Sequence, residues 1–292
     1  MDLWPAILWL GVVIFAALTP GWAAQNEAPR SKIERLSGIE QRVGGRLGVA
    51  TLDTATGRHF EYRATERFPI CSTFKFLAAA AVLGQCDQKK QRLDRLVSYG
   101  QADLLEYAPV TRQHLAEGGM PLGELCAAAI AYSDNTAGNL LLQTIGGPGE
   151  LTRYLRSLGD ETTRLDRNEP SLNTAIKGDV RDTTTPASML HDMERLLIRD
   201  ALSTGAKQQL ETWLLANTTG AKRLRAGLPN NWRIGDKTGT GENGATNDIA
   251  IVWPPDRAPI LVTAFLVEST VSSADREAAI ADVARLIAAE RD

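Results

Sequence analysis

Histidine is scarce in this chain of 292 residues, which contains three. They stand far apart, at His59, His114 and His191, and form neither an H-x-H nor an H-E-x-x-H pattern. Zinc hydrolases hold their metal with closely spaced ligands of this kind, so the sequence argues against a zinc hydrolase. We expect no metal site and no cofactor.

Cysteine is equally scarce, with three residues at Cys71, Cys86 and Cys126. Their spacing is not that of metal ligands, and Cys71 and Cys126 lie in apolar runs, where cysteine acts as a small buried hydrophobic residue. An odd number leaves at least one thiol free in an exported protein. The sequence leaves undecided whether Cys86 and Cys126 form a disulfide bridge.

A large excess of one charge is also missing, since 32 Lys and Arg stand against 35 Asp and Glu, a net charge of −3. This balance argues against broad electrostatic binding of nucleic acid or anionic lipid. An anionic ligand would therefore need a local cluster of cations. The chain also lacks the G-x-S-x-G and P-loop patterns that an α/β-hydrolase or a P-loop nucleotide enzyme would need.

The amino terminus carries one apolar run, from Leu3 to Leu18, with no Lys or Arg before it. The run is short for a membrane span of about 20 residues. Gly21 and Ala23 then form the small-x-small pattern of a cleavage site. We interpret residues 1–24 as a signal peptide, with a membrane anchor as the alternative. We expect a periplasmic or secreted protein with no stable membrane insertion after processing.

Strand patterns come from the two ends of the chain and helix patterns from its middle. Residues 31–45 predict a helix with a serine N-cap and a double glycine at its end, and residues 46–68 predict a β-hairpin. Residues 247–270 predict two stronger strands, and residues 273–290 an amphipathic closing helix. Residues from about 72 to 215 read as helices and loops.

Strands joined by tight turns pair in an antiparallel manner. A sheet made from both chain ends must therefore close around the helical middle as an insertion. We expect an α/β fold of two lobes with a cleft between them. One lobe comprises residues 25–68 and 216–292, and the all-helical lobe comprises residues 69–215.

Ser72 and Lys75 form an S-x-x-K pattern at the start of a predicted helix. Residues three apart share one helix face, and a serine hydroxyl becomes a nucleophile when a neighbouring base takes its proton. The pattern is weak alone, because it occurs about once by chance in a chain of this length. Taken alone, it is better explained as an N-capping serine followed by a solvated lysine.

Two further patterns are also weak when each is taken alone. Residues 133–135 read S-D-N between two apolar helical runs, where Ser133 or Asp134 would serve as a helix N-cap. Residues 237–239 read K-T-G on a strand-like stretch, where the glycine would let a ligand approach the backbone. A surface loop with a lysine is the simpler interpretation of the second pattern.

Taken in this order, the three patterns resemble the signature set of class A β-lactamases and penicillin-binding proteins. The segments "DLLEYAPVT", "YSDNTAGNLLL", "RDTTTPASM" and "GDKTGT" also resemble class A β-lactamases at matching positions, so the resemblance covers about residues 30 to 290. It implies a β-lactamase/penicillin-binding transpeptidase-like fold, in which terminal helices flank an antiparallel five-stranded sheet beside an all-helical lobe. It also implies a small-molecule β-lactam substrate and a monomer.

The resemblance assigns the residues of acyl transfer. Ser72 would attack the lactam carbonyl and form an acyl-enzyme, with Lys75 assisting its deprotonation. The backbone N–H groups of Ser72 and Thr240 would form the oxyanion hole. Ser133 would pass a proton to the departing lactam nitrogen, and Asp134 would tie the two lobes together.

The resemblance also assigns substrate-binding residues. Asn135 would hold the side-chain amide of the substrate. The substrate carboxylate would meet Lys237 and the hydroxyls of Thr238 and Thr240, which supplies the local positive charge that a mildly acidic protein needs.

Four positions depart from the commonest family pattern or stand at its margin. Thr246 occupies the place where many members carry an arginine, and Arg223 stands where a subset carries a substitute, so we assign carboxylate binding to Arg223. Tyr107 resembles the aromatic residue at the pocket rim. Cys71 resembles a cysteine that some members bridge to the position of Gly241, so that bridge cannot form here.

Glu169 and Asn173 match the class A pattern E-x-x-x-N. A carboxylate can take a proton from water, and an amide can fix the position of that water. Arg167 and Asp182 resemble the ion pair that closes an omega-like loop, here residues 164–182.

The resemblance further predicts a cis peptide bond between Glu169 and Pro170. Glu169 and Asn173 favour a secreted serine β-lactamase, which releases its acyl group, over a protein that only becomes acylated. Two alternatives remain: a D,D-peptidase or penicillin-binding protein, and a non-enzymatic β-lactam-sensing domain, which would usually need further transmembrane segments.

Overall fold

The computed structural model describes Met1 and residues 31–289. Apart from Met1, the predicted signal peptide, residues 1–24, lies outside the described residues. Within the described part, no helix has the length and apolar character needed to cross a membrane.

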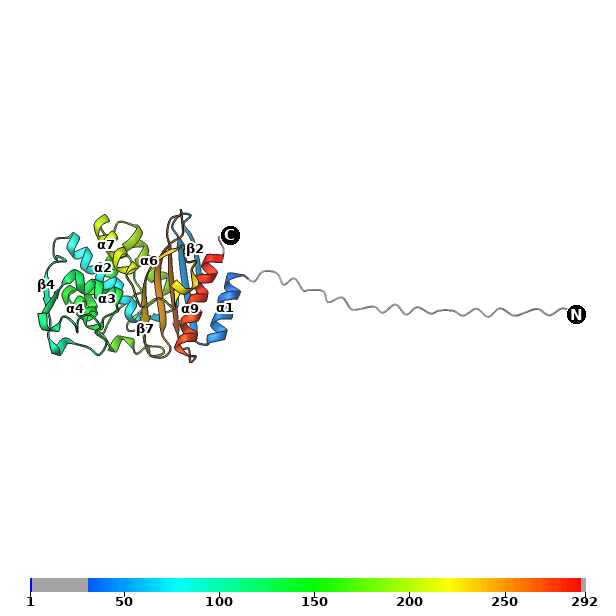
Figure 1. Ribbon diagram of the computed structural model, residues 1–292, viewed down its shortest axis with the longest axis horizontal. Coiled ribbons are helices and arrows are strands. Elements are labelled where there is room, and N and C mark those ends of the chain that lie inside the picture. Colours follow the sequence, from blue (N-terminus) through cyan, green and yellow to red (C-terminus); the bar gives the residue numbers. More distant parts are fainter. Residues whose placement is uncertain (2–30, 290–292) are drawn as a thin grey trace. The chain divides into compact units, whose positions relative to one another are not determined.

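Five antiparallel strands form the main sheet in the order β2-β1-β9-β8-β7. They are β1 (Arg46–Asp53), β2 (Arg58–Tyr62), β7 (Arg233–Thr240), β8 (Thr246–Trp253) and β9 (Ile260–Val267). β1 pairs with β9 along its whole length, from Arg46 opposite Val267 to Asp53 opposite Ile260. The prediction of an antiparallel five-stranded sheet made from both chain ends is therefore confirmed (Figure 1).

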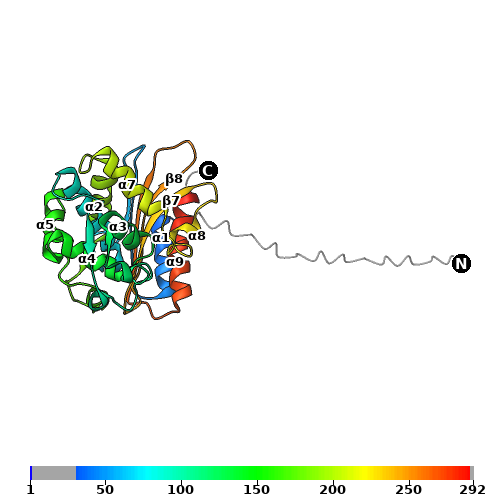
Figure 2. The ribbon, with the colours of Figure 1, turned by 60° about the vertical axis from the view of Figure 1, so that its left-hand side comes forward.

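Helices α1 (Lys32–Val43) and α9 (Ser273–Ala288) lie side by side on one face of the sheet (Figures 1 and 2). Leu36 of α1 and Ile280 of α9 are buried in one apolar cluster with sheet residues such as Val262. Burying side chains of this size stabilises the fold by roughly 1.5–3 kcal/mol each. The short α8 (Leu224–Gly227) packs against α9.

The helical part covers the opposite face, where α6 (Pro186–Met193) packs against β1 and β9. At its centre lies α2 (Phe74–Asp87), in which every residue from Phe74 to Gly84 is buried. A helix that is apolar on all sides is buried on all sides, and Figure 2 shows its neighbours gathered around it. These neighbours are α3 (Leu122–Ala131), α4 (Asn135–Ile145), α5 (Pro148–Leu158) and α7 (Thr204–Leu215).

The middle of the chain was expected to contain helices and loops alone, and the structure corrects this. Two short sheets occur there, β4 (Leu96–Ser98) with β5 (Gly119–Pro121), and β3 (Phe68–Pro69) with β6 (Thr183–Thr184). Strands of two or three residues are too short to show a period of two in the sequence. Whether they form depends on tertiary packing. The lobe boundaries at residues 68 and 215 stay a prediction.

All three cysteines are free thiols, so Cys86 and Cys126 do not form a bridge. Cys71 and Cys126 are fully buried. Burial raises the pKa of the Cys71 thiol to about 12, which leaves it protonated and unreactive at neutral pH. A Cβ atom at Gly241 would lie 2.8 Å from Cys71 Sγ, so this sulfur fills the space beside the glycine.

Candidate active site

Ser72 lies in a 3₁₀ turn, Cys71–Thr73, directly before α2. The preceding Cys71 has a φ of 45°, an uncommon left-handed conformation for a non-glycine residue. Lys75, one turn further, points its Nζ to within 3.1 Å of Ser72 Oγ. The S-x-x-K spacing therefore brings an amine to a hydroxyl, and the reading of Lys75 as a solvated lysine is wrong because its side chain is fully buried.

Polar groups from three segments surround Lys75 Nζ. It donates to Ser133 O at 2.8 Å and Asn135 Oδ1 at 2.6 Å, and it lies 3.1 Å from Glu169 Oε1. Burial lowers the pKa of Lys75, while the Glu169 carboxylate acts in the opposite direction. The amine can therefore lose its proton more readily than an exposed lysine.

The S-D-N residues lie at the junction of α3 and α4. Asp134 is the N-cap of α4, where its Oδ1 accepts from the Ala137 N–H at 2.9 Å. Its other oxygen accepts from the Val110 and Thr111 N–H groups at 3.0 and 2.9 Å. We expected Asp134 to tie the two lobes together. These partners all lie in residues 69–215, so the contacts do not join the two lobes. The carboxylate instead accepts hydrogen bonds from nearby backbone N–H groups.

Lys237 makes the contact across the lobes. It projects from β7, and its Nζ donates to Ser133 Oγ at 2.9 Å and to Thr238 O at 2.7 Å. Burial, together with the positive charges of Lys75 and Arg223, lowers the pKa of Lys237 well below its usual value. Ser133 Oγ thus lies next to two lysines, since Lys75 Nζ is 3.5 Å away.

Arg223 is buried behind the strand edge. Its Nη1 donates to Gly239 O and Asn247 O, each at 2.8 Å. Its Nη2 donates to Thr240 Oγ1 at 2.7 Å and lies 3.5 Å from Glu277 Oε1. The guanidinium therefore adds positive charge directly behind Thr240.

The omega-like loop, residues 164–182, is closed at its neck by Arg167 and Asp182. Arg167 Nε lies 2.5 Å from Asp182 Oδ2, and the Arg167 N–H donates to Asp182 Oδ1 at 2.9 Å. The peptide bond between Glu169 and Pro170 is cis, as predicted.

Glu169 reaches from this loop to the serine. Its Oε1 accepts from Ser72 Oγ at 3.1 Å, and its Oε2 accepts from Asn173 Nδ2. Asn173 Oδ1 is buried without a hydrogen-bond partner among the described residues. A buried acceptor without a partner is costly, and a water molecule is its usual partner.

A cavity of about 300 Å³ opens onto these groups. Nine residues line it: Ser72, Tyr107, Ser133, Asn135, Asn173, Thr219, Arg223, Thr238 and Thr240. Eight of them are among the predicted site residues, and Tyr107, which is 51% exposed, stands at the rim. Lys75, Glu169 and Lys237 lie buried behind the wall.

The sequence reading missed two residues of this site. Asn139 hydrogen bonds to the backbone of Glu169, and Thr219 Oγ1 lies 2.5 Å from Thr238 Oγ1. Asn139 follows Asn135 by one helical turn on α4, so spacing alone could have indicated that both face the site. No short-range signal indicates Thr219.

The described residues offer no group of three His, Cys, Asp or Glu side chains that could hold a metal ion. Residues 239–244 read G-x-G-x-x-G, but they connect the antiparallel strands β7 and β8. A dinucleotide-binding turn requires a helix after the strand, so this string is not one.

Comparison with known proteins identifies the relatives of this chain. The model of a family described as the beta-lactamase enzyme family matches residues 28–290. Beta-lactamase OXY-2 of Klebsiella oxytoca is 44% identical over 286 residues, which is 97% of each chain. Beta-lactamase CTX-M-8 of Citrobacter amalonaticus is 47% identical over 87% of each chain.

Solved structures give the same result. The structure titled ancestral (GNCA) beta-lactamase class A has a TM-score of 0.87 and 61% identity, and the match covers 88% of this chain and 99% of that one. A structure described as the putative class A beta-lactamase PenP from Rhodopseudomonas palustris has a TM-score of 0.87 and 53% identity, covering 88% of this chain and 98% of that one.

Proposed function

This chain belongs to the class A β-lactamase family, and we propose that it hydrolyses the β-lactam amide through an acyl-enzyme on Ser72 that Glu169 helps to release. One observation carries the proposal. Ser72 Oγ lies 3.1 Å from both Lys75 Nζ and Glu169 Oε1, so two bases lie within hydrogen-bond reach of the hydroxyl.

In the acylation step, the Ser72 oxygen forms a bond to the lactam carbonyl carbon while its proton moves to a neighbouring base. Lys75 can accept that proton when its amine is neutral, which its lowered pKa favours. The Glu169 carboxylate touches the same hydroxyl and is the second acceptor within reach. Negative charge then develops on the carbonyl oxygen, and we assign its stabilisation to the backbone N–H groups of Ser72 and Thr240.

The carbon–nitrogen bond then breaks, and the departing nitrogen needs a proton. Ser133 is placed to supply it, because its hydroxyl lies 3.5 Å from Lys75 Nζ and accepts from Lys237 Nζ at 2.9 Å. The proton that Lys75 took from Ser72 can return through Ser133, so no net charge is left behind in the buried site.

Deacylation requires a water molecule close to the ester carbon of Ser72. Glu169 Oε1 and the unpartnered Asn173 Oδ1 are the acceptors that can hold it. Glu169 takes one proton from the water, and the remaining hydroxide attacks the carbon. The bond between this carbon and the Ser72 oxygen then breaks, and the proton passes from Glu169 to that oxygen, 3.1 Å away, which also restores the carboxylate. A positioned base of this kind contributes about 10²- to 10⁴-fold to the rate.

Substrate recognition follows from charge and hydrogen bonding along the cavity. We assign the β-lactam carboxylate to the hydroxyls of Thr238 and Thr240, with the positive charges of Lys237 and Arg223 behind them. Asn135 lines the same cavity, where its side chain can bind the substrate's amide. Tyr107 borders the opening.

Hydrolysis of the chromogenic β-lactam nitrocefin tests the reaction. We expect many turnovers per protein molecule and none with Ser72→Ala. One stoichiometric burst without further turnover would make the chain a penicillin-binding protein instead. A D,D-peptidase would release D-alanine from a cell-wall peptide, which we expect this protein not to do.

We also propose that the protein is exported by residues 1–24 and acts as a monomer in the periplasm or outside the cell. The relatives' names identify them as β-lactamases, and the apolar run with its small-x-small site supports export. Amino-terminal sequencing of the exported protein should find the cut after Ala23 or Ala24. Light scattering should give the mass of one chain, and recovery of uncut protein from the membrane would contradict export.

A further inference from the structure

The turn between β7 and β8, residues 241–245, contacts the omega-like loop directly. The Glu242 N–H donates to Asn173 O at 2.8 Å. The next residue, Asn243, donates from Nδ2 to Thr174 O at 3.0 Å and to Ala175 O at 3.2 Å. Three consecutive carbonyl groups of the loop, beginning at Asn173, are thus bound by one turn.

The turn is itself fixed to the sheet. The Glu268 N–H, directly after β9, donates to Asn243 O at 2.7 Å, and the Ala245 N–H donates to Glu242 O at 3.0 Å. Asn243 has a φ of 50°, a left-handed conformation that asparagine and glycine adopt more easily than other residues. The side-chain amide of Asn243 is therefore held at a fixed place opposite the loop.

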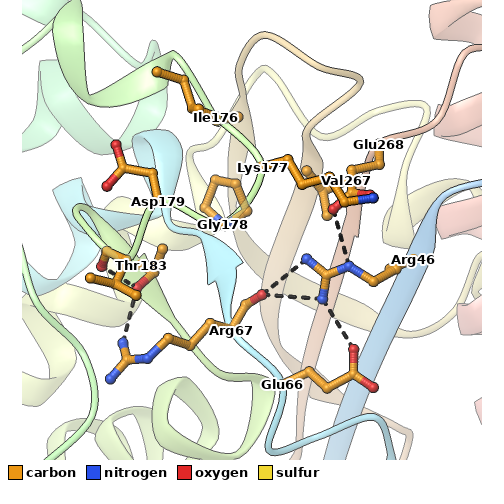
Figure 3. A pocket seen from close by; sticks show the side chains of 13 residues that line it. Arg46, Glu66, Arg67, Ile176, Lys177, Gly178, Asp179, Thr183, Val267 and Glu268 are labelled. Atoms are coloured by element: carbon orange, nitrogen blue, oxygen red, sulfur yellow. Dashed lines mark hydrogen bonds and ion pairs between the residues drawn. The ribbon is translucent and has the colours of Figure 1, made fainter.

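On this side of the omega-like loop Leu172 and Ala175 are buried in the core, whereas Ile176 and Val180 are exposed. A cavity of about 280 Å³ lies under residues 175–180, between the loop and the ends of β1 and β9 (Figure 3). Across it, Lys177 Nζ forms an ion pair with Glu268 at 2.9 Å, but the Lys177 side chain is 81% exposed. Such exposed pairs contribute little, so residues 172–175 are held by three kinds of contact: the burial of Leu172 and Ala175, the hydrogen bond from Arg167 Nη1 to Thr174 Oγ1 at 3.1 Å, and the hydrogen bonds from the turn.

Glu169 is attached by a different element. Asn139, on α4, accepts from the Glu169 N–H at 2.9 Å and donates to Glu169 O at 3.0 Å. The backbones of the two residues that contact the hydrolytic water under the proposed function are thus anchored to different elements, and their side chains are joined by the hydrogen bond from Asn173 Nδ2 to Glu169 Oε2. Glu169 is anchored to the helical part, and the Asn173 segment to the sheet.

We propose that Asn243 is a positioning residue, which holds the Asn173 segment in place for deacylation without affecting acylation. This rests on the proposed function. Loss of the Asn243 amide frees the carbonyl groups of Thr174 and Ala175, so Asn173 moves relative to a Glu169 that stays in place. Acylation uses Ser72, Lys75 and Glu169 together with the Thr240 N–H, and Thr240 is held by the pairing of β7 with β8 rather than by the Asn243 side chain.

Two substitutions in the full mature chain separate the amide from the backbone. Asn243→Gly removes the side chain and keeps a residue that accepts the left-handed φ. Asn243→Asp keeps the shape but places a carboxylate oxygen against two carbonyl oxygens. Asn231→Gly, in an exposed turn before β7, is the matched control.

Rapid-mixing kinetics with nitrocefin should show an unchanged acylation rate for Asn243→Gly and a deacylation rate constant lowered about fivefold, the effect of one neutral hydrogen bond. The steady-state fraction of acylated Ser72, seen by mass spectrometry, should rise accordingly. Asn243→Asp should show a larger loss of deacylation, and Asn231→Gly none. An unchanged deacylation rate, or an equal fall of both rates, overturns the proposal.

Amide hydrogen exchange tests the anchoring without any turnover. In Asn243→Gly, peptides covering residues 170–176 should exchange faster, while peptides covering α4 should not change. If the wild-type protein fails to turn over nitrocefin, the proposed function falls, and the exchange measurement still decides whether Asn243 anchors the loop. Identical exchange in the two proteins shows that it does not.

Discussion

Asn139 binds both polar groups of the Glu169 backbone, since its Oδ1 accepts from the Glu169 N–H at 2.9 Å and its Nδ2 donates to Glu169 O at 3.0 Å. A side-chain amide that uses its donor and its acceptor on one residue fixes that residue's orientation as well as its distance. The carboxylate of Glu169 thus starts from a backbone held by helix α4. This explains how a residue on a loop can point reliably at Ser72 Oγ, 3.1 Å away.

Replacing Glu169 separates the two halves of the reaction. In Glu169→Ala, Lys75 loses the negative charge 3.1 Å from its Nζ, so its pKa falls further and its amine remains able to accept the Ser72 proton. Acylation therefore continues, while deacylation falls about 10²- to 10⁴-fold. Mass spectrometry after mixing with a penicillin should find a persistent adduct on Ser72. Glu61→Ala, on the exposed side of β2, should show no adduct, and the absence of one in Glu169→Ala would contradict the role of Glu169.

Gly138 on α4 sets the position of the Lys75 amine. A Cβ atom there would lie 2.7 Å from Lys75 Cε and 3.3 Å from Phe74 Cζ, too close for either to stay in place. Gly138→Ala should therefore push the lysine away from Ser72 and lower the acylation rate at least about tenfold, since small misplacements in an active site have large effects. Stopped-flow acylation kinetics measure this.

A second glycine-to-alanine variant, compared with Gly138→Ala by thermal unfolding, is the control for the acylation experiment. A glycine-to-alanine change favours a helix by about 1 kcal/mol, which offsets part of the steric cost. Gly149→Ala, in α5 with open space around its Cβ, should stabilise the protein and leave acylation unchanged. Equal acylation rates in the two variants would show that Gly138 does not position Lys75.

The sequence indicated most of this site because its reactive residues lie in short, rare patterns. Ser72 and Lys75 are one helical turn apart, so local geometry alone predicts that they meet. Burial could not be predicted in the same way: taken alone, the S-x-x-K pattern favoured a solvated Lys75, and only the packing around this residue shows that it is buried. The sheet was predictable because whole strands from the chain ends carry its pattern, whereas β3 and β6 pair through two residues each.

Long-range polar contacts could not be predicted from the sequence for a different reason. The Thr219–Thr238 contact and the attachment of Asn243 to the omega-like loop join segments that only the complete fold brings together. No period or spacing records such pairs. Asp134 shows the opposite case, since the pattern of a helix N-cap was already visible and its carboxylate does cap α4.

Glu277 limits the positive charge that Arg223 can offer to a substrate. Its Oε1 lies 3.5 Å from Arg223 Nη2, and both side chains are largely buried. Glu277→Gln removes the competing negative charge, so the KM for a β-lactam that carries a carboxylate should fall about two- to fivefold, with kcat little changed. Steady-state kinetics at low and high salt measure this, and Asp275→Asn, which alters a neighbouring charge on α9, is the control. A KM that rises in Glu277→Gln would contradict the assignment of Arg223 to carboxylate binding.

Asp192 gives the protein a pH-dependent stability that is separate from catalysis. Its carboxyl is fully buried next to that of Asp160, and neither oxygen accepts a hydrogen bond from any other described residue. Burial, with the charge of Asp160, raises the pKa of Asp192 well above its usual 3.8. Asp160 stays ionised, because it accepts from the Thr162 and Thr163 N–H groups at 2.7 and 3.0 Å. The buried pair therefore keeps one proton, on Asp192.

The sign of the effect follows from proton counting. Between pH 4 and the raised pKa, the folded protein holds a proton at Asp192 that the unfolded chain has lost, so the contribution of Asp192 to the free energy of unfolding decreases as pH rises. Asp192→Asn keeps a neutral side chain that can donate to Asp160, so its stability should lack this decrease. In urea unfolding from pH 5 to 8, the free energy of unfolding of the variant should increase relative to that of the wild type as pH rises. The increase should reach about 1–3 kcal/mol. Asp200→Asn, at an exposed position, should show the same change of unfolding free energy with pH as the wild type. A constant difference between Asp192→Asn and the wild type across this range would mean that the pKa of Asp192 is not raised in the folded protein.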